Sequence, residues 1–275
     1  MFRLLNIEIH KLKHNRASRI LILIYFILLT SIALIAAIKF DIGPIQFHLA
    51  EQGIFNFPYI WHFNTFMASI FKFFLLLVIV SMMANEYSNK TLKQNLIDGL
   101  SKKEFVLSKF YTVVLLALIS TIFVFFVSVV LGYIYSDFTE FSIVITDLEY
   151  LAAFFFKLVG FFSFGLFLGI LVKRSAFAVG AMLVWLMIEG FTKGMLYWKL
   201  EDHVNQIMQF LPLEAMANLI KEPFTRLSAV KTVAKQVGED LSKDFSVQPL
   251  TILIVLVWTA IFIYFSYVLL KKRDL

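Results

Sequence analysis

The chain has 275 residues, of which 60% are hydrophobic and 16% are charged, and its mean hydropathy is +0.83. Soluble globular domains are about half apolar and about one quarter charged, so the composition argues against a soluble protein. The net charge of +6 accompanies long apolar segments, which favours a role in membrane topology over nucleic-acid binding. The chain has no cysteine, which excludes disulfides, thiol nucleophiles and cysteine metal sites.

The first element is an amphipathic segment over residues 2–14. Phe2, Leu5, Ile9 and Leu12 share one helical face, and the basic residues lie elsewhere on the helix. This pattern predicts a helix that lies on the inner membrane surface.

Six later segments are apolar enough to cross a bilayer, which takes about 20 mostly apolar residues. They cover residues 18–39, 61–84, 110–135, 150–172, 175–197 and 249–271. We therefore predict an all-α integral membrane protein with six transmembrane helices in one domain, 1–275. A cytoplasmic segment, 86–104, follows the second span, and an external loop, 199–247, has helix-like stretches around 213–221 and 227–241.

The basic residues define the orientation. Fifteen of the 25 lie in the N-terminal segment, the loop after span two, the turn between spans four and five, and the C-terminal tail. The short loops on the opposite side are acidic. Because short cytoplasmic loops carry an excess of Lys and Arg, both termini are predicted to be cytoplasmic.

Apart from residues at the ends of the spans, four charged residues fall within them: Lys72, Lys157, Glu189 and Lys193. Charge inside a membrane is costly and often functional, and the helical rise places the first three in the outer half. They could form an ion pair that lines an external vestibule. The alternative, which we favour, is that each lysine reaches the outer headgroups and Glu189 pairs with Lys193 one turn away.

Two G-x-x-x-G motifs occur, Gly165–Gly169 and Gly190–Gly194. Such motifs let helices approach closely. They predict either packing within the chain, which is the simpler interpretation, or a seam between two chains.

Sequence motifs for nucleotide hydrolysis or proteolysis are missing. The chain has no G-x-x-x-x-G-K-[ST], no H-E-x-x-H and no G-x-S-x-G. We therefore expect no enzymatic activity, no metal site and no cofactor in this chain.

The most specific segment is 85–109, NEYSNKTLKQNLIDGLSKKEFVLSK. Ser101 and Glu104 fit a capping box at the start of span three, and Gly99 fits a helix C-terminus. Residues 92, 96 and 100 form a leucine stripe. The stripe is either a docking surface or packs on the protein's own helices or on lipid.

This segment resembles the loop between spans two and three in bacterial ABC-transporter permeases of the exporter-type (type-2) superfamily. The six-span layout agrees over the whole chain, but the sequence match is specific only over about 85–109. One departure is basic Lys102–Lys103, where relatives often have an arginine after the serine.

The resemblance implies a membrane subunit of an ATP-driven exporter in the bacterial inner membrane. Residues 86–101 would be the coupling helix in a cleft of a separate ATP-binding subunit, which would bind ATP and Mg²⁺. A second permease chain, identical or a paralogue, would complete the pathway. The matched coupling positions are Glu86, Tyr87, Thr91, Leu92, Gln94, Asn95, Leu96, Gly99, Ser101 and Lys102, with polar anchoring assigned to Glu86, docking to Leu92 and Leu96, and turn geometry to Gly99.

The sequence is also compatible with two other functions. A membrane anchor or sensor could dock a non-ATPase cytoplasmic partner through residues 86–109. An ATPase-independent carrier is less favoured, because no charge falls near the midplane on a broken helix, where carriers place their sites.

Overall fold

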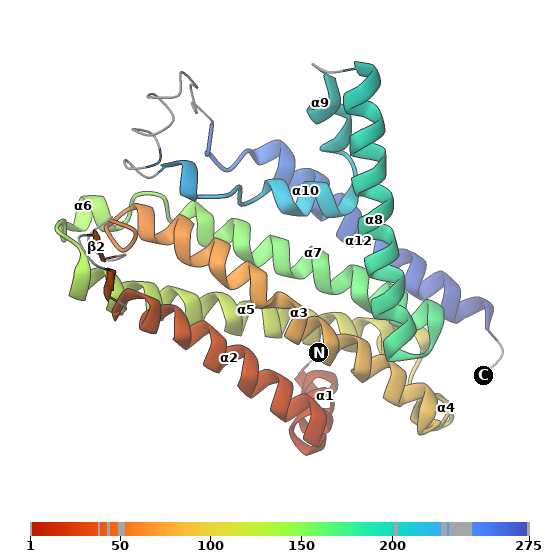
Figure 1. Ribbon diagram of the computed structural model, residues 1–275. Helices are drawn as coiled ribbons and strands as arrows, with labels where there is room; N and C mark the ends of the chain where they lie inside the picture. Colours follow the sequence, from red (N-terminus) through yellow and green to blue (C-terminus); the bar gives the residue numbers. More distant parts are fainter. Residues whose placement is uncertain are drawn as a thin grey trace.

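The computed structural model describes residues 2–37, 39–42, 45–48, 53–200, 203–226, 230 and 244–273. Long helices lie side by side and form a bundle (Figure 1). In chain order the elements are α1 (Phe2–His14), α2 (Arg16–Ala37), β1 (Lys39–Ile42), β2 (Ile45–His48), α3 (Tyr59–Ser88), α4 (Thr91–Ile97), α5 (Lys102–Tyr135), α6 (Phe141–Val144), α7 (Glu149–Val172), α8 (Ser175–Leu200), α9 (Val204–Met208), α10 (Pro212–Asn218), the 3₁₀ helix η3 (Phe224–Arg226) and α12 (Pro249–Lys272).

Five helical segments are long and apolar enough to cross a membrane: α3, α5, the α6–α7 pair, α8 and α12. The chain is therefore a multi-pass membrane protein. Helix α2 coincides with the first predicted span, but it meets the same criterion only together with α1, to which it is bent by 88°.

The bend between α1 and α2 falls at Asn15. Its side-chain Oδ1 accepts a hydrogen bond from the backbone N–H of Ser18 at 3.0 Å, which is the contact of an N-cap residue. The predicted amphipathic helix over residues 2–14 is thus present as α1, and Asn15 starts a new helix in a different direction.

The tightest packing in the bundle joins α3 and α7. A Cβ added at Gly165 would overlap the Leu76 side chain, and one at Gly169 would lie 3.1 Å from Met83 Cβ. The first G-x-x-x-G motif therefore does pack within the chain, as its simpler interpretation predicted.

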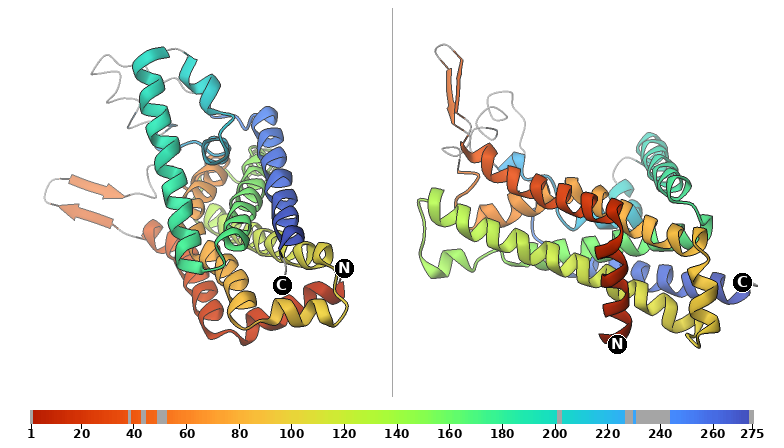
Figure 2. Two further views of the ribbon diagram at one scale, coloured as in Figure 1. Left: turned by 90° about the vertical axis from the view of Figure 1, so that its right-hand side faces the viewer. Right: turned by 90° about the horizontal axis from the view of Figure 1, so that it is seen from below.

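Two short strands were not predicted. β1 and β2 pair antiparallel, with Lys39 opposite His48, and the hairpin projects from the end of α2 (Figure 2). The all-α prediction treated the residues after the first span, which it ended at 39, as a short loop, and it therefore missed the hairpin. We call this end of the bundle, with α6 and the hairpin, the outer end, and the end with α1 and α4 the inner end.

Helix α8 leaves the bundle after its first turns (Figure 1). Only 17% of its most apolar stretch is buried, against 72% for α6–α7. The segment after α8 returns to the bundle through α9 and α10. The helix predicted around 213–221 is present as α10, whereas that around 227–241 lies outside the described residues apart from residue 230.

Side chains of the outer end hold the segment between α10 and α12. His62 donates through Nε2 to the Lys221 carbonyl at 2.9 Å and stacks on Tyr150 at 4.2 Å. Arg226 lies 3.2 Å from His62 Nδ1 and 3.4 Å from Asp147 Oδ2. These contacts hold the segment between α10 and α12 against α3 and α7.

We predict that Gly165→Val destabilises the protein by about 1–3 kcal/mol, because the added atoms overlap Leu76 in a closely packed seam. SDS titration in mixed micelles would measure the free energy of unfolding. Gly180→Val on α8 is the matched control, since nothing lies within 4 Å of a Cβ there. Equal effects of the two substitutions would contradict the assignment of this seam.

Candidate functional site

The predicted coupling segment forms a short helix at the inner end. α3 continues to Ser88, Lys90 takes a left-handed conformation with φ 55°, and α4 covers only Thr91–Ile97. Gly99 has φ +97°, which glycine adopts readily. Ser101 and Glu104 form the predicted capping box at the start of α5. The segment 86–101, predicted as one helix, thus contains the end of α3, a turn and the short helix α4.

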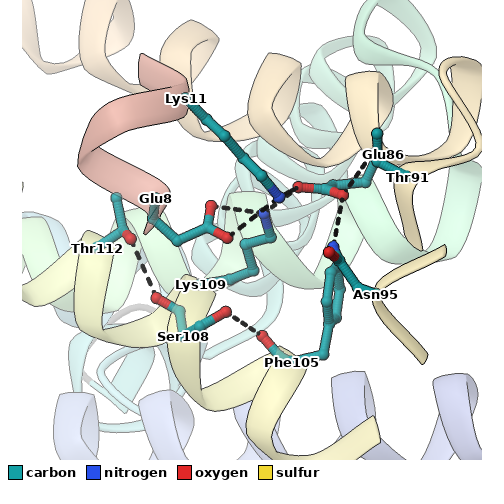
Figure 3. A network of polar contacts seen from close by, with 9 residues as sticks. All are labelled: Glu8, Lys11, Glu86, Thr91, Asn95, Phe105, Ser108, Lys109 and Thr112. Atoms are coloured by element: carbon teal, nitrogen blue, oxygen red, sulfur yellow. Dashed lines mark hydrogen bonds and ion pairs between the residues drawn. The ribbon is translucent and has the colours of Figure 1, made fainter. Parts of the chain in front are cut away.

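The Glu86 carboxylate is the centre of this region (Figure 3). Its Oε1 accepts from Lys109 Nζ at 2.5 Å and from Lys11 Nζ at 2.7 Å. Its Oε2 accepts from Thr91 Oγ1 at 2.6 Å and from Asn95 Nδ2 at 3.5 Å. One buried side chain of α3 therefore contacts α1, α4 and α5.

A second carboxylate completes the arrangement. Glu8 of α1 lies 2.6 Å from Lys109 Nζ and 3.6 Å from Lys11 Nζ. We call Glu8, Lys11, Glu86 and Lys109 the inner charge cluster. Its two positive and two negative charges balance, and the Lys109 side chain is fully buried. A buried charge needs such partners, because losing one leaves another uncompensated.

The leucine stripe of α4 faces the protein. Leu92 is buried, and Leu96 and Leu100 pack against the core, which matches the alternative in which the stripe contacts the protein's own helices. Of the two leucines predicted to dock a partner, Leu92 is thus covered by the chain itself and Leu96 is partly exposed. The face of α4 that is exposed carries Lys93, Gln94, Ile97 and Asp98.

Two other predicted coupling residues contact the C-terminal tail. The Tyr87 hydroxyl accepts from Arg273 Nη1 at 3.3 Å, and Lys102 Nζ donates to the Arg273 carbonyl at 2.9 Å. Arg273 also donates to the Leu171 carbonyl at 2.9 Å. Tyr87 near the end of α3 and Lys102 at the start of α5 thus both contact Arg273, directly after α12.

From the sequence, Lys11 and Lys109 serve only to orient the chain, and Glu8 has no assigned role. Two of the three carry a signal: Glu8 is the sole acidic residue of the amphipathic segment 2–14, and Lys109 lies at the start of an apolar run. The sequence does not show that Lys109 contacts Glu8, because the two residues are 101 positions apart.

The outer intramembrane charges hold α10 from both ends. Glu189 of α8 accepts from the backbone N–H of Leu213 at 3.1 Å and of Glu214 at 2.8 Å. Lys157 of α7 donates to the carbonyls of Ala217 and Ile220 at 3.5 and 3.4 Å. A negative group at a helix N-terminus and a positive group at its C-terminus are both favourable.

These contacts differ from both predicted arrangements. Glu189 also accepts from Trp185 Nε1 at 2.6 Å, whereas Lys193 pairs with Glu214 at 2.5 Å. Lys72 lies 4.5 Å from the centre of the Phe161 ring. Among the described residues, Glu189 therefore pairs with neither Lys193 nor the other two lysines. Local spacing along the helices did not identify the partners of these charges.

The second G-x-x-x-G motif lies on an exposed face of α8. At Gly190 and Gly194, nothing described lies within 4 Å of an added Cβ. This differs from Gly165 and Gly169, which contact α3. Within the described part of the chain, the α8 motif has no helix to pack against.

The chain belongs to the family described as "Protein of unknown function (DUF2705)", whose model matches residues 26–275. Among curated proteins, no sequence matches the chain.

We predict that Lys109→Met costs about 3–5 kcal/mol of unfolding free energy, because Glu8 and Glu86 then share only Lys11. Adding Glu8→Gln should recover part of the loss by restoring neutrality. SDS titration checks both variants, with exposed Lys103→Met as the control expected within about 0.5 kcal/mol of the native protein. Additive losses in the double variant would show that Glu8 and Lys109 are not coupled.

Proposed function

We propose that this member of the DUF2705 family is the membrane-spanning subunit of an ABC transporter, that it exports its substrate, and that a separate ATP-binding subunit drives it. The proposal rests on the resemblance of residues 85–109 to the coupling loop of exporter-type permeases. The observation that supports it best is the Glu86 carboxylate, which connects α4 to α1 and α5.

This connection suits a coupling element. Moving α4 alone would separate Thr91 and Asn95 from Glu86, leaving a buried carboxylate with fewer partners. A displacement of α4 is therefore expected to move α3 as well. Because the inner charge cluster connects α3 to α1 and α5, these helices are expected to move too. An ATPase outside the membrane requires such a connection to change the arrangement of the spans.

The distribution of basic residues supports the orientation. The N-terminal helix, α4 and the C-terminus lie at the same end (Figure 2), and Lys102 and Arg273 join the tail to α5 and α7 there. Because Lys and Arg mark the cytoplasmic side, we place the inner end in the cytoplasm of a bacterial cell. In this arrangement α2 crosses the membrane in addition to the five helices named above, which gives six spans, and α1 lies on the inner membrane surface.

A second permease chain fits the exposed side of α8. Gly190 and Gly194 lie one turn apart on an exposed face of α8, among large exposed side chains that include Phe191 and Trp198. Small residues at this spacing favour close helix contact in a membrane. We place the second chain, an identical copy or a paralogue, against this face.

The exposed face of α4 gives a direct test of the partner. Ile97 is 74% exposed, and we predict that Ile97→Glu reduces recovery of a P-loop ATPase at least tenfold when the chain is purified in mild detergent. Quantitative mass spectrometry would identify and measure the ATPase. The control is Ile145→Glu, a similar change at an exposed site of the outer end.

The result also separates the two candidate partners. If no P-loop ATPase accompanies the native chain and a different cytoplasmic protein does so through Ile97, the chain is a membrane anchor or sensor. Recovery of the ATPase with Ile97→Glu at the native level would contradict docking through this face of α4.

The chain's lack of cysteine allows a simple test of the α8 contact. A Gly190→Cys variant, oxidised in membranes, should form a disulfide-linked dimer, because the residue is exposed on the proposed seam. Non-reducing electrophoresis distinguishes a homodimer from a link to a paralogue by mass. Ser163→Cys, a substitution of similar size at a fully buried position of α7, is the control and should stay monomeric. Absence of any cross-link at 190 would argue against the seam.

A further inference from the structure

A pocket of about 640 Å³ opens in the outer half of the molecule. Its lining includes residues of α7, α8, α10 and the start of α12. Figure 1 shows that α8 diverges from the other long helices. Most of the residues that line it are polar or charged, and they include Lys157, Lys193, Glu214, Asn218, Lys221, Glu222 and Gln248. Of the three charges considered for an external vestibule, Lys157 lines this pocket, whereas Lys72 and Glu189 do not belong to its lining.

Lys157 differs from the other cations of this pocket. Lys193 has the Glu214 carboxylate at 2.5 Å, and Lys221 donates to the Asp244 carbonyl at 2.5 Å. Lys157 is only 3% exposed, yet its ammonium has just two carbonyl contacts, at 3.4 and 3.5 Å. Within the described residues it has no carboxylate partner.

The inner end shows how this protein compensates a buried lysine elsewhere. Lys109 has two carboxylates, at 2.5 and 2.6 Å. An ammonium has three hydrogen-bond donors, and a buried charge is costly unless it is paired. The long carbonyl contacts of Lys157 therefore leave this cation less well compensated than Lys109, and it lines an open polar pocket.

We propose that the pocket binds a phosphate group, whose anionic oxygens accept from Lys157. Amide side chains of Asn218 and Gln248 line the same pocket and supply further hydrogen-bonding groups. The phosphate belongs either to an anionic lipid headgroup or to a free phosphoanion. This site depends on the geometry of the chain alone and stands whether or not the chain is part of a transporter.

The test uses the purified full chain in detergent micelles and follows its thermal unfolding by tryptophan fluorescence. The two probes are inorganic phosphate, compared with chloride at equal ionic strength, and phosphatidylglycerol, compared with phosphatidylcholine. Binding to the folded state raises the unfolding temperature in a concentration-dependent way. Lys157→Met should weaken the apparent affinity about tenfold or more, and Lys157→Arg should largely keep it.

Lys72→Met is the control for loss of a lysine from the spans. It removes a cation outside the pocket lining and should retain the response. Ala217→Phe fills the pocket from an exposed position while leaving Lys157 in place. It should abolish the response, and it carries the test if Lys157→Met does not fold.

The outcomes are distinct. Stabilisation by inorganic phosphate identifies a free phosphoanion, and stabilisation by phosphatidylglycerol alone identifies a lipid headgroup. No stabilisation by either probe, or a full response in the Ala217→Phe variant, overturns the proposal. None of these outcomes depends on whether an ATPase binds α4.

Discussion

The arrangement of the inner end depends on one constraint: a carboxylate buried at the end of a membrane helix must be surrounded by donors. Glu86 satisfies this requirement with side chains from three other helices. The same constraint applies to Glu8 and Lys109, so the four charges hold one another in place. Hydrophobic burial alone does not specify helix direction in lipid, where tails are as apolar as the helix surface. The inner charge cluster supplies that specificity.

The outer end uses the same physics for a different element. There, Glu189 and Lys157 hold a helix of seven residues by its backbone ends, through the unpaired N–H and C=O groups that every helix leaves exposed. A short helix is marginal by itself, and α4 at the inner end is equally short. Both are held by buried charges from long helices, one through side chains and the other through its termini.

What the sequence predicted well was local. Apolar runs of about 20 residues located the spanning helices, and the capping box at Ser101 and the turn at Gly99 were predicted from adjacent residues. What it missed was set by distant contacts: Glu8 and Lys109 are 101 positions apart, and Glu189 bonds to backbone groups of another helix. The direction of the leucine stripe also depended on tertiary packing, because helical spacing shows that a face exists but not what covers it.

The anchoring of α10 gives the outer pocket a geometric dependence on the spans. Its N-terminus follows α8 through Glu189, and its C-terminus follows α7 through Lys157. Helix α10 therefore connects α7 to α8 at a fixed distance. If α8 moved towards the bundle, the N-terminus of α10 would move with it while the C-terminus stayed beside α7, and the part of the pocket lining formed by Ala217 and Asn218 would rotate. A change in the angle between α7 and α8 is thus expected to change the opening of the pocket beside Lys157.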